Sequence, residues 1–205
     1  MNTHIEKVSY IIGRQIGGDF FNQGIEVNLE SFINGFSTAL KDEASLLTPE
    51  ETNEIMNAFQ VEMAAKSQKR SQEMAEKNIT LGKEYLENNL KNEGVKSTAS
   101  GLQYKIEKSG EGKTPEATSN VEVHYEGTLL DGSVFDSSYQ RGQTTSFPVN
   151  GVIAGWTEAL QLMKEGDIWH LTIPSELAYG ERGAGGKIGP HAVLNFKVEL
   201  VKVNS

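Results

Sequence analysis

The chain has 205 residues, enough for one large domain or two small ones with a buried core. Its 37% hydrophobic and 23% charged residues are typical of a soluble globular protein, and no apolar run approaches the roughly 18–20 residues that a membrane span needs. The net charge of -9 argues against a nucleic-acid partner, and the absence of cysteine excludes disulfides, thiolate catalysis and iron–sulfur clusters.

The first ten residues contain no continuous apolar segment behind a basic head, which a secretory signal would require. We therefore expect a cytoplasmic protein with no membrane partner, although a leader that had already been removed would leave no trace.

Two short amphipathic helices are predicted before residue 41. The first begins at a capping box formed by Thr3 and Glu6 and ends at Gly24. The second begins after Asn28, a favoured capping residue. Their apolar stripes, with spacings of three and four residues, are Ile5, Val8, Ile12, Ile16 and Phe20, then Leu29, Phe32, Ile33, Phe36 and Leu40.

A third, long helix is predicted over about residues 49–93. Thr48, Pro49 and Glu51 supply a capping residue, a proline at the first helical position and a glutamate at the third. No proline interrupts the pattern before Gly94. At about 1.5 Å per residue this helix would span roughly 67 Å, so we interpret it as a spacer as well as a packing element.

The helical part is too small to bury its own apolar stripes well, and it has neither cysteine nor a metal motif to stabilise it. We therefore expect it to form a homodimer, with Gly13, Gly17 and Gly18 allowing helices to approach closely. The alternative is a monomeric three-helix cap folded back on the rest of the chain.

The composition changes near residue 94. Residues 92–100, with Gly94 and a Ser/Thr cluster, are predicted to be a linker between a helical region, 1–94, and a second domain, 95–205. The second domain shows alternating strands around Leu102–Ile106, Val121–Tyr125, Asp167–Ile173 and Leu194–Leu200. It also carries an Asp131-Gly132 hairpin and one short helix at 155–163. The predicted fold class is α+β, an antiparallel sheet wrapped around one short helix behind an all-helical region.

Several common chemistries are excluded. The glycine-rich stretch 183–188 resembles a phosphate loop, but Ile188 stands where a Ser or Thr is required and no apolar helix follows. The four histidines lack metal-ligand spacing, and no Gly-x-Ser-x-Gly elbow exists for a serine nucleophile. What remains is a set of aromatic and aliphatic residues beside turns, which suits an apolar cleft; plain core is the alternative for some of them.

Five segments resemble the FKBP-type peptidyl-prolyl cis–trans isomerases, in family order over about 90 residues. They are Val123–Gly127, Asp131–Ser138, Val152–Trp156, Ile173–Gly180 and Pro190–Leu200. The helical part further resembles the dimeric, macrophage-infectivity-potentiator-like branch of the family.

The resemblance implies a pocket with Trp156 as its floor and Asp136 and Tyr179 as rim polar groups, and the backbone N–H of Ile153 as a donor to a substrate carbonyl. The implied catalytic residues are Asp136, Tyr179, Phe135, Trp156 and Ile153. The implied substrate-binding residues are Tyr125, Phe147, Val152, Ile188 and Phe196. Departures are Thr145 for a frequent aromatic, Gly189-Pro190 for a Pro-Pro pair and Ala154 for a frequent arginine; the first is expected to weaken macrolide affinity.

The implied activity is isomerisation of X-Pro bonds in unfolded or partly folded proteins, with chaperone-like client binding by the dimeric helical region. It requires no metal or cofactor, because an apolar pocket stabilises the twisted, less polar amide better than the planar one. The barrier is ~18–20 kcal/mol, and lowering it by about 4 kcal/mol accelerates the reaction roughly a thousandfold. The alternative is a non-catalytic binding module or holdase that captures apolar segments.

Overall fold

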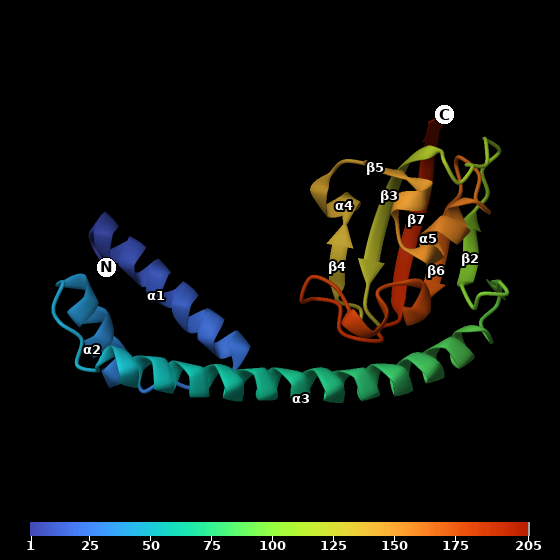
Figure 1. Ribbon diagram of the computed structural model, residues 1–205. Helices are drawn as coiled ribbons and strands as arrows, with labels where there is room; N and C mark the ends of the chain where they lie inside the picture. Colours follow the sequence, from blue (N-terminus) through green and yellow to red (C-terminus); the bar gives the residue numbers. More distant parts are fainter. Residues whose placement is uncertain (205) are drawn as a thin grey trace. The chain divides into compact units, whose positions relative to one another are not determined.

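The computed structural model describes residues 1–204, and these form two compact units that divide between Glu62 and Met63 (Figure 1). The first contains α1 (His4–Gln23), α2 (Leu29–Leu40) and the start of α3 (Pro49–Asn89). The rest of α3 and every strand belong to the second. None of the helices in residues 1–204 is both long enough and apolar enough to cross a membrane.

The predicted helix starts are confirmed atom by atom. The Thr3 hydroxyl accepts from the Glu6 N–H at 3.3 Å, and the Glu6 carboxylate accepts from the Thr3 N–H at 3.1 Å. Thr48 and Glu51 repeat this reciprocal arrangement at 3.2 and 2.8 Å. Each pair satisfies backbone donors that the first turn of a helix leaves without an intrahelical acceptor.

The long helix ends at Asn89, four residues before the predicted end at 93. Successive tight turns follow, with the Asn92 N–H donating to the Asn89 carbonyl at 3.1 Å and the Val95 N–H donating to the Asn92 carbonyl at 3.2 Å. Gly94 then adopts the left-handed conformation, at φ 80°. This conformation turns the chain into the sheet at little steric cost because glycine has no Cβ.

The second unit is built on one antiparallel sheet. Its strand order is β1-β2-β6-β7-β3-β4, and β5 pairs with the first half of β3 whereas β4 pairs with its last residues. The strands are β1 (Val95–Ser97), β2 (Gln103–Lys108), β3 (Asn120–Thr128), β4 (Val134–Ser137), β5 (Thr145–Pro148), β6 (Ile168–Ile173) and β7 (Leu194–Asn204). The short helices are α4 (Ser138–Arg141) and α5 (Ala154–Leu160), with 3-10 turns η1 (Val149–Gly151), η2 (Ser175–Leu177) and η3 (Gly180–Arg182).

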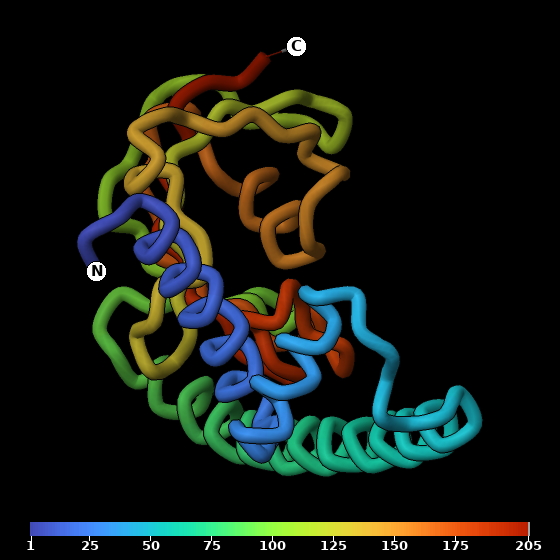
Figure 2. The backbone as a smooth tube through the Cα atoms, turned by 90° about the vertical axis from the view of Figure 1, so that its left-hand side faces the viewer, coloured from blue at the N-terminus to red at the C-terminus, as the bar shows by residue number. Residues whose placement is uncertain are grey.

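One face of this sheet holds the core of the unit. Along β3 the residues at 121, 123, 125 and 127 are buried and their neighbours are not, which is the period-two pattern of a half-buried strand. Trp156, Ala159 and Leu160 of α5 are buried in the same cluster, which also contains Leu171 and Val198 of the sheet. Figures 1 and 2 show α5, in orange, covering this face. The predicted sheet around one short helix is confirmed.

The second half of α3 packs on the sheet unit. The Asn78 side chain donates to the Pro190 carbonyl at 2.8 Å, and the Asn89 side chain donates to Gln103 at 2.8 Å. Gly82 is buried against Val193, and a Cβ at position 82 would lie only 2.8 Å from a Val193 methyl group. The helix can therefore approach the loop before β7 because position 82 has no side chain.

The linker prediction for residues 92–100 is wrong in part, because Val95–Ser97 forms the edge strand β1 and pairs with Gln103–Lys105 of β2. A three-residue strand is too short to show alternation in the sequence. The boundary between residues 94 and 95 stays a prediction based on composition, whereas the contacts divide the chain inside α3.

Candidate active site

A pocket of about 430 Å³ opens on the α5 side of the sheet. Segments far apart in the sequence supply its walls: β3, β4, β5, the turn before α5, the loop after β6, and β7. Its lining residues are Tyr125, Phe135, Asp136, Phe147, Gly151, Val152, Ile153, Trp156, Tyr179 and Phe196. We call this site the Trp156 pocket.

Trp156 makes the floor, and three other rings stand around it edge-on. Its ring centroid lies 5.2 Å from that of Tyr125, 5.9 Å from Phe147 and 5.3 Å from Phe196, with interplanar angles of 88°, 85° and 79°. Edge-to-face contacts of this kind are a favourable arrangement of aromatic rings. The floor is therefore a fixed, apolar surface rather than a loose collection of side chains.

A glycine in β3 allows the rings to approach one another. Gly127 pairs with Phe196 in β7, and a Cβ at position 127 would lie 2.5 Å from the Phe135 ring and 2.7 Å from the Phe196 ring. Phe135 and Phe196 then meet edge to face with their centroids 5.5 Å apart. The missing side chain at position 127 creates the space for this wall of the pocket.

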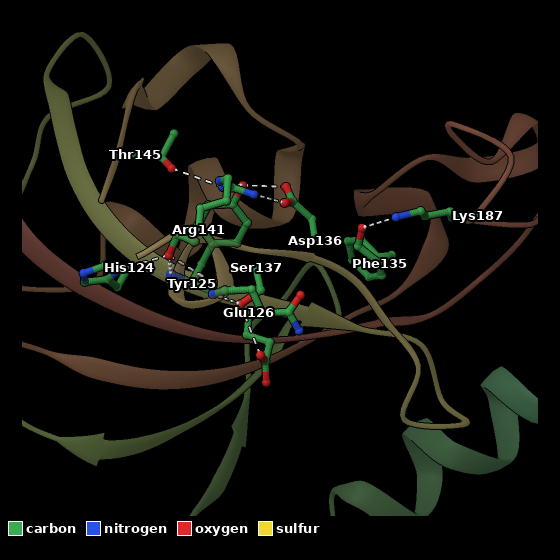
Figure 3. A network of polar contacts seen from close by, with 11 residues as sticks. His124, Tyr125, Glu126, Phe135, Asp136, Ser137, Arg141, Thr145 and Lys187 are labelled. Carbon is green, nitrogen blue, oxygen red and sulfur yellow. Dashed lines mark hydrogen bonds and ion pairs between the residues drawn. The ribbon is translucent and has the colours of Figure 1, made fainter. Parts of the chain in front are cut away.

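The polar rim of the pocket is a three-residue network shown in Figure 3. The Tyr125 hydroxyl donates to one carboxylate oxygen of Asp136 at 2.5 Å, and the Arg141 guanidinium pairs with the other oxygen. Arg141 also donates to the Tyr125 hydroxyl at 2.9 Å and lies over the Tyr125 ring at 5.5 Å from its centroid. Both carboxylate oxygens are thus engaged, which fixes the orientation of Asp136.

The network also sets the charges of the rim. Burial disfavours the ionised form of Asp136, but hydrogen bonds from Tyr125 and Arg141 and the positive charge of Arg141 outweigh it, and they lower the pKa of the Asp136 carboxyl. Burial, together with the hydrogen bond to Asp136, raises the pKa of the Tyr125 hydroxyl. At neutral pH the rim therefore presents a carboxylate held by a protonated phenol and a guanidinium.

A buried serine, Ser138, connects β3, which carries Tyr125, to the end of β4, which carries Asp136. Ser138 accepts from the Tyr125 N–H at 2.7 Å and donates to the Tyr125 carbonyl at 3.2 Å. Ser138 is fully buried, and it follows directly on β4, which carries Asp136. This contact fixes the backbone of Tyr125 relative to the Asp136 strand.

The remaining walls come from turns. Val152 and Ile153 precede α5, and Ile153 is its N-cap residue, so its backbone lies where N–H groups lack intrahelical acceptors. Tyr179 lies between η2 and η3 with 40% of its surface exposed. Both turns place their side chains at the pocket through local backbone geometry rather than through strand pairing.

The structure brings together nine of the ten residues that the sequence singled out, since all but Ile188 line the Trp156 pocket. Ile188 is instead placed in the core, at 8% exposure. Its backbone exchanges two hydrogen bonds with Ala184, at 2.9 and 3.0 Å. This bridge closes the 184–188 loop and turns the Ile188 side chain inward.

Sequence reasoning missed Gly151, which lines the pocket, and Arg141, which orients Asp136. Gly151 carries no side chain, so no residue pattern marks it. Arg141 could have been suspected, because it is a cation five residues after the rim carboxylate, but its contact depends on the four-residue helix α4. Thr145 also meets this network, accepting from Arg141 at 3.3 Å.

The arrangement is suited to binding an apolar group rather than to attacking one. Six aromatic rings and two aliphatic side chains line the pocket, and its single carboxylate is already paired. No group of three or more His, Asp or Glu side chains suited to a metal ion occurs in residues 1–204. A planar, polar amide would lose solvation here, and its twisted, less polar form would lose less.

Comparisons with known proteins agree with this geometry. Residues 111–201 match the family model described as FKBP-type peptidyl-prolyl cis–trans isomerase, and residues 5–106 match the model for the domain amino-terminal to it. A relative from Escherichia coli, named FKBP-type 22 kDa peptidyl-prolyl cis–trans isomerase, is 46% identical over 96% of this chain and 94% of its own.

Two further similarities cover nearly the whole chain. The outer membrane protein MIP of Legionella longbeachae is 40% identical over 99% of this chain and 87% of its own. The crystal structure of FkpA from Escherichia coli aligns with a TM-score of 0.73 at 37% identity, covering 100% of this chain and 98% of that one.

Proposed function

The chain belongs to the FKBP-type peptidyl-prolyl cis–trans isomerase family, and from that premise we propose that the Trp156 pocket is where it isomerises X-Pro bonds. The enzyme class and the role in protein folding are those of the family. The observation that carries the assignment of the site is the ring of four aromatic side chains closed on one edge by the oriented Asp136 carboxylate.

In this proposal the proline ring lies on Trp156, between Tyr125, Phe147 and Phe196. The X-Pro amide twists in the apolar space above them, where its polarity is lowest midway through rotation. Because the pocket stabilises that twisted form better than the planar one, it lowers the barrier of ~18–20 kcal/mol without a covalent step.

Asp136 acts as an orienting and polarising group rather than as a proton donor. Its carboxyl has a lowered pKa and is ionised at neutral pH, so it has no proton to give. The backbone N–H of Ile153 is the proposed donor to a substrate carbonyl, and the Tyr179 hydroxyl is the proposed polar group on the opposite rim. Both lie in turns that line the pocket.

A protease-coupled assay on a short Xaa-Pro tetrapeptide tests the assignment. Asp136→Ala and Tyr179→Phe are expected to lower kcat/KM, whereas Tyr139→Phe, on the neighbouring α4 and outside the pocket, should leave it unchanged. Full activity in both pocket variants would refute this placement of the site. Absence of turnover by the wild type would favour the alternative, a non-catalytic holdase.

We also propose that residues 1–62 mediate homodimerisation. A groove of about 500 Å³ runs along α1, lined by its glycines together with Tyr10, Arg14 and Phe21. No atom of this chain outside the helix lies within 4 Å of a Cβ built on Gly13, Gly17 or Gly18. A helix of a second copy could therefore approach the backbone of α1 closely.

Gly17→Leu separates the dimer from the monomeric alternative. A Cβ at this position has no atom of its own chain outside α1 within 4 Å, whereas a leucine side chain would block a second helix, so sedimentation should show a monomer. Gln72→Leu, on an exposed part of α3, is the matched control and should remain dimeric. A wild-type chain that sediments as a monomer would refute the proposal.

Client proteins are proposed to bind through the paired helical regions, which raises their local concentration near each pocket. A fragment beginning at Met63 keeps the contacts of α3 with the sheet and should turn over the tetrapeptide like the full chain. It should refold a proline-limited protein less well. Equal loss on both substrates would contradict this division of labour.

A macrolide inhibitor is proposed to occupy the same pocket, with affinity reduced because Thr145 stands where a further aromatic wall is frequent. Titration followed by tryptophan fluorescence tests this because Trp156 is the floor of the pocket, and an unchanged spectrum at saturating macrolide would refute it. The cytoplasmic location stays a prediction, and cell fractionation tests it; one relative is named an outer membrane protein.

A further inference from the structure

A second hollow lies beside the active site, between α3 and the hairpin that joins β3 to β4. It has a volume of about 430 Å³, the same as the Trp156 pocket. Met74 and Leu81 of α3 form one wall, and Leu129 and Leu130 of the hairpin form the other. We call it the helix–hairpin groove. All of its residues belong to the second compact unit.

The groove exposes apolar surface in a concave place. Met74 and Leu81 are 39% and 43% exposed, and Leu129 and Leu130 are half-buried opposite them. Single exposed apolar residues are ordinary on a protein surface, but a contiguous hollow of them marks a place where a ligand would bury apolar area.

The side chains that line the groove carry more positive than negative charge, whereas the whole chain is negatively charged. Arg70, Lys77 and Lys187 line it together with only two carboxylates, those of Glu73 and Asp131, although the whole chain carries a net charge of -9. Both carboxylates and two of the three cations already have partners, because Arg70 has an interaction of its own and the charge of Lys77 acts on Asp131, where it helps to lower the pKa. Glu73 pairs with Lys69 at 3.9 Å, and Asp131 accepts from the Ser133 hydroxyl at 2.6 Å. The remaining lining cation is Lys187, and beside the apolar walls its charge favours an apolar ligand that also carries negative charge.

The groove lies next to the Trp156 pocket, and Lys187 stands between them. Lys187 lines the groove. It also lines a small cavity of about 220 Å³, whose other walls include Phe135 and Asp136 of the Trp156 pocket. Its ammonium donates to the Phe135 carbonyl at 3.3 Å, and Figure 3 shows it reaching this carbonyl from the side opposite Arg141. No carboxylate lies within ion-pair distance of Lys187 in residues 1–204.

We propose that the helix–hairpin groove binds the stretch of client polypeptide that flanks the proline held in the Trp156 pocket, and that it favours aliphatic and acidic side chains there. The proposal rests on the proposed function of that pocket. The occupant is the client chain because Lys187 lines the groove and also reaches the backbone of Phe135 in the pocket wall, so the two sites are neighbours on the surface. Lys187 is the specificity-determining residue, since an acidic client side chain would meet it on leaving the pocket.

Peptides that share one Xaa-Pro core test this. The reference is a tetrapeptide, which occupies only the Trp156 pocket. Longer peptides extend the same core residue by residue on either side. One series adds leucine and glutamate, and the other adds leucine and lysine. For the wild type we expect the leucine–glutamate extension on one side to raise kcat/KM about fivefold over the tetrapeptide, and the lysine extension to raise it less.

Variants locate the effect. Met74→Gln and Leu81→Gln should bring the ratio of kcat/KM for the extended and short peptides down to about one, because they remove apolar surface from the groove. Lys187→Glu should reverse the preference, so that the lysine extension is favoured. Ile79→Gln is the matched control: Ile79 is 52% exposed on the same helix but outside the groove, so the wild-type ratio should persist.

Three outcomes would overturn the proposal. The first is wild-type turnover of the tetrapeptide with no gain from either extension. The second is an equal loss of the ratio in Ile79→Gln and Leu81→Gln. The third is a change of sedimentation in Met74→Gln, which would show that a second copy covers the groove. Failure of the wild type to turn over even the tetrapeptide would refute the proposed function itself, and the groove proposal with it.

Discussion

Residues 1–62 and residues 63–204 contain the same kinds of apolar side chain but bury them to very different degrees. None of the side chains in residues 1–62 is buried, and Ile5, Leu40 and Phe21 are 73%, 73% and 85% exposed. In the second unit Val123, Leu171 and Leu200 are almost completely buried. The helical unit has well-formed caps and amphipathic stripes, yet these alone do not give it a core.

The difference shows that the sequence signals that start a helix are separate from those that bury it in a core. Capping boxes and helical periodicity fix where α1, α2 and α3 begin, because they depend on residues within one turn. Burial depends on volume, and three helical segments enclose too little of it. The second unit has a buried core because α5 packs on one face of the seven-stranded sheet.

The largest expected effect comes from removing a core side chain. Leu171→Ala should lower the free energy of unfolding by about 2–5 kcal/mol, since Leu171 is 2% exposed and truncation leaves a cavity. Leu40→Ala in α2 should cost less than about 0.5 kcal/mol in the monomer. Denaturant unfolding followed by tryptophan fluorescence measures the first effect, because both tryptophans, Trp156 and Trp169, lie in the second unit. Loss of helical circular dichroism, measured in the Gly17→Leu background expected to be monomeric, gives the second effect. Similar losses would contradict the contrast between the units.

The next effect concerns the helix that belongs to both units. Gly82→Leu should destabilise the packing of α3 on the sheet by about 1–3 kcal/mol, because even a Cβ there lies 2.8 Å from Val193. Ser71→Leu, exposed on the same helix, serves as control. Hydrogen exchange of the α3 amides is the measurement, and unchanged protection of residues 75–89 in Gly82→Leu would contradict the prediction.

A smaller effect is expected at the rim of the pocket. Arg141→Met should lower kcat/KM on the tetrapeptide about three- to tenfold, because Asp136 loses a partner and its orientation. The pKa of the Asp136 carboxyl should rise in this variant. Arg182→Met, on η3 but outside the pocket lining, is the control. An unchanged rate and an unchanged acid limb of the pH profile would show that Arg141 does not position Asp136.

The smallest effect is expected from pH. The pKa of Asp136 is lowered, so the stability contributed by its paired carboxylate is present above the unfolded value of about 3.9 and is lost as the pH falls through the folded value. Tyr125 has a raised pKa and stays protonated well into alkaline solution. Turnover should therefore be nearly flat from about pH 5 to about pH 8. A bell-shaped profile within that range would contradict a mechanism without proton transfer.

Much of the site could be predicted from the sequence, because aromatic residues beside turns are unusual and their order matches a known family. Nine of the ten residues singled out meet in one pocket. Ile188 could not be placed, because its direction is set by the backbone bridge to Ala184. Arg141 was missed because its contact depends on how α4 turns after β4.

The same distinction holds for the fold. The period-two pattern predicted β3 and β7, whose pairing runs over nine residues of β3. It did not predict β1 or β5, of three and four residues, because strands this short are defined by the neighbours they pair with. The division of α3 between two units is also absent from the sequence pattern, since its helical period continues across Glu62 and Met63.

The burial of Gly82 has a consequence for how α3 tolerates change. Along most of this helix any good helix former should be accepted, because the side chains there face solvent. At position 82 every replacement adds an atom where Val193 already lies, so a substitution scan of α3 should show a sharp minimum there, outside the Trp156 pocket. A residue that contributes no side chain would then be among the most constrained in the helix.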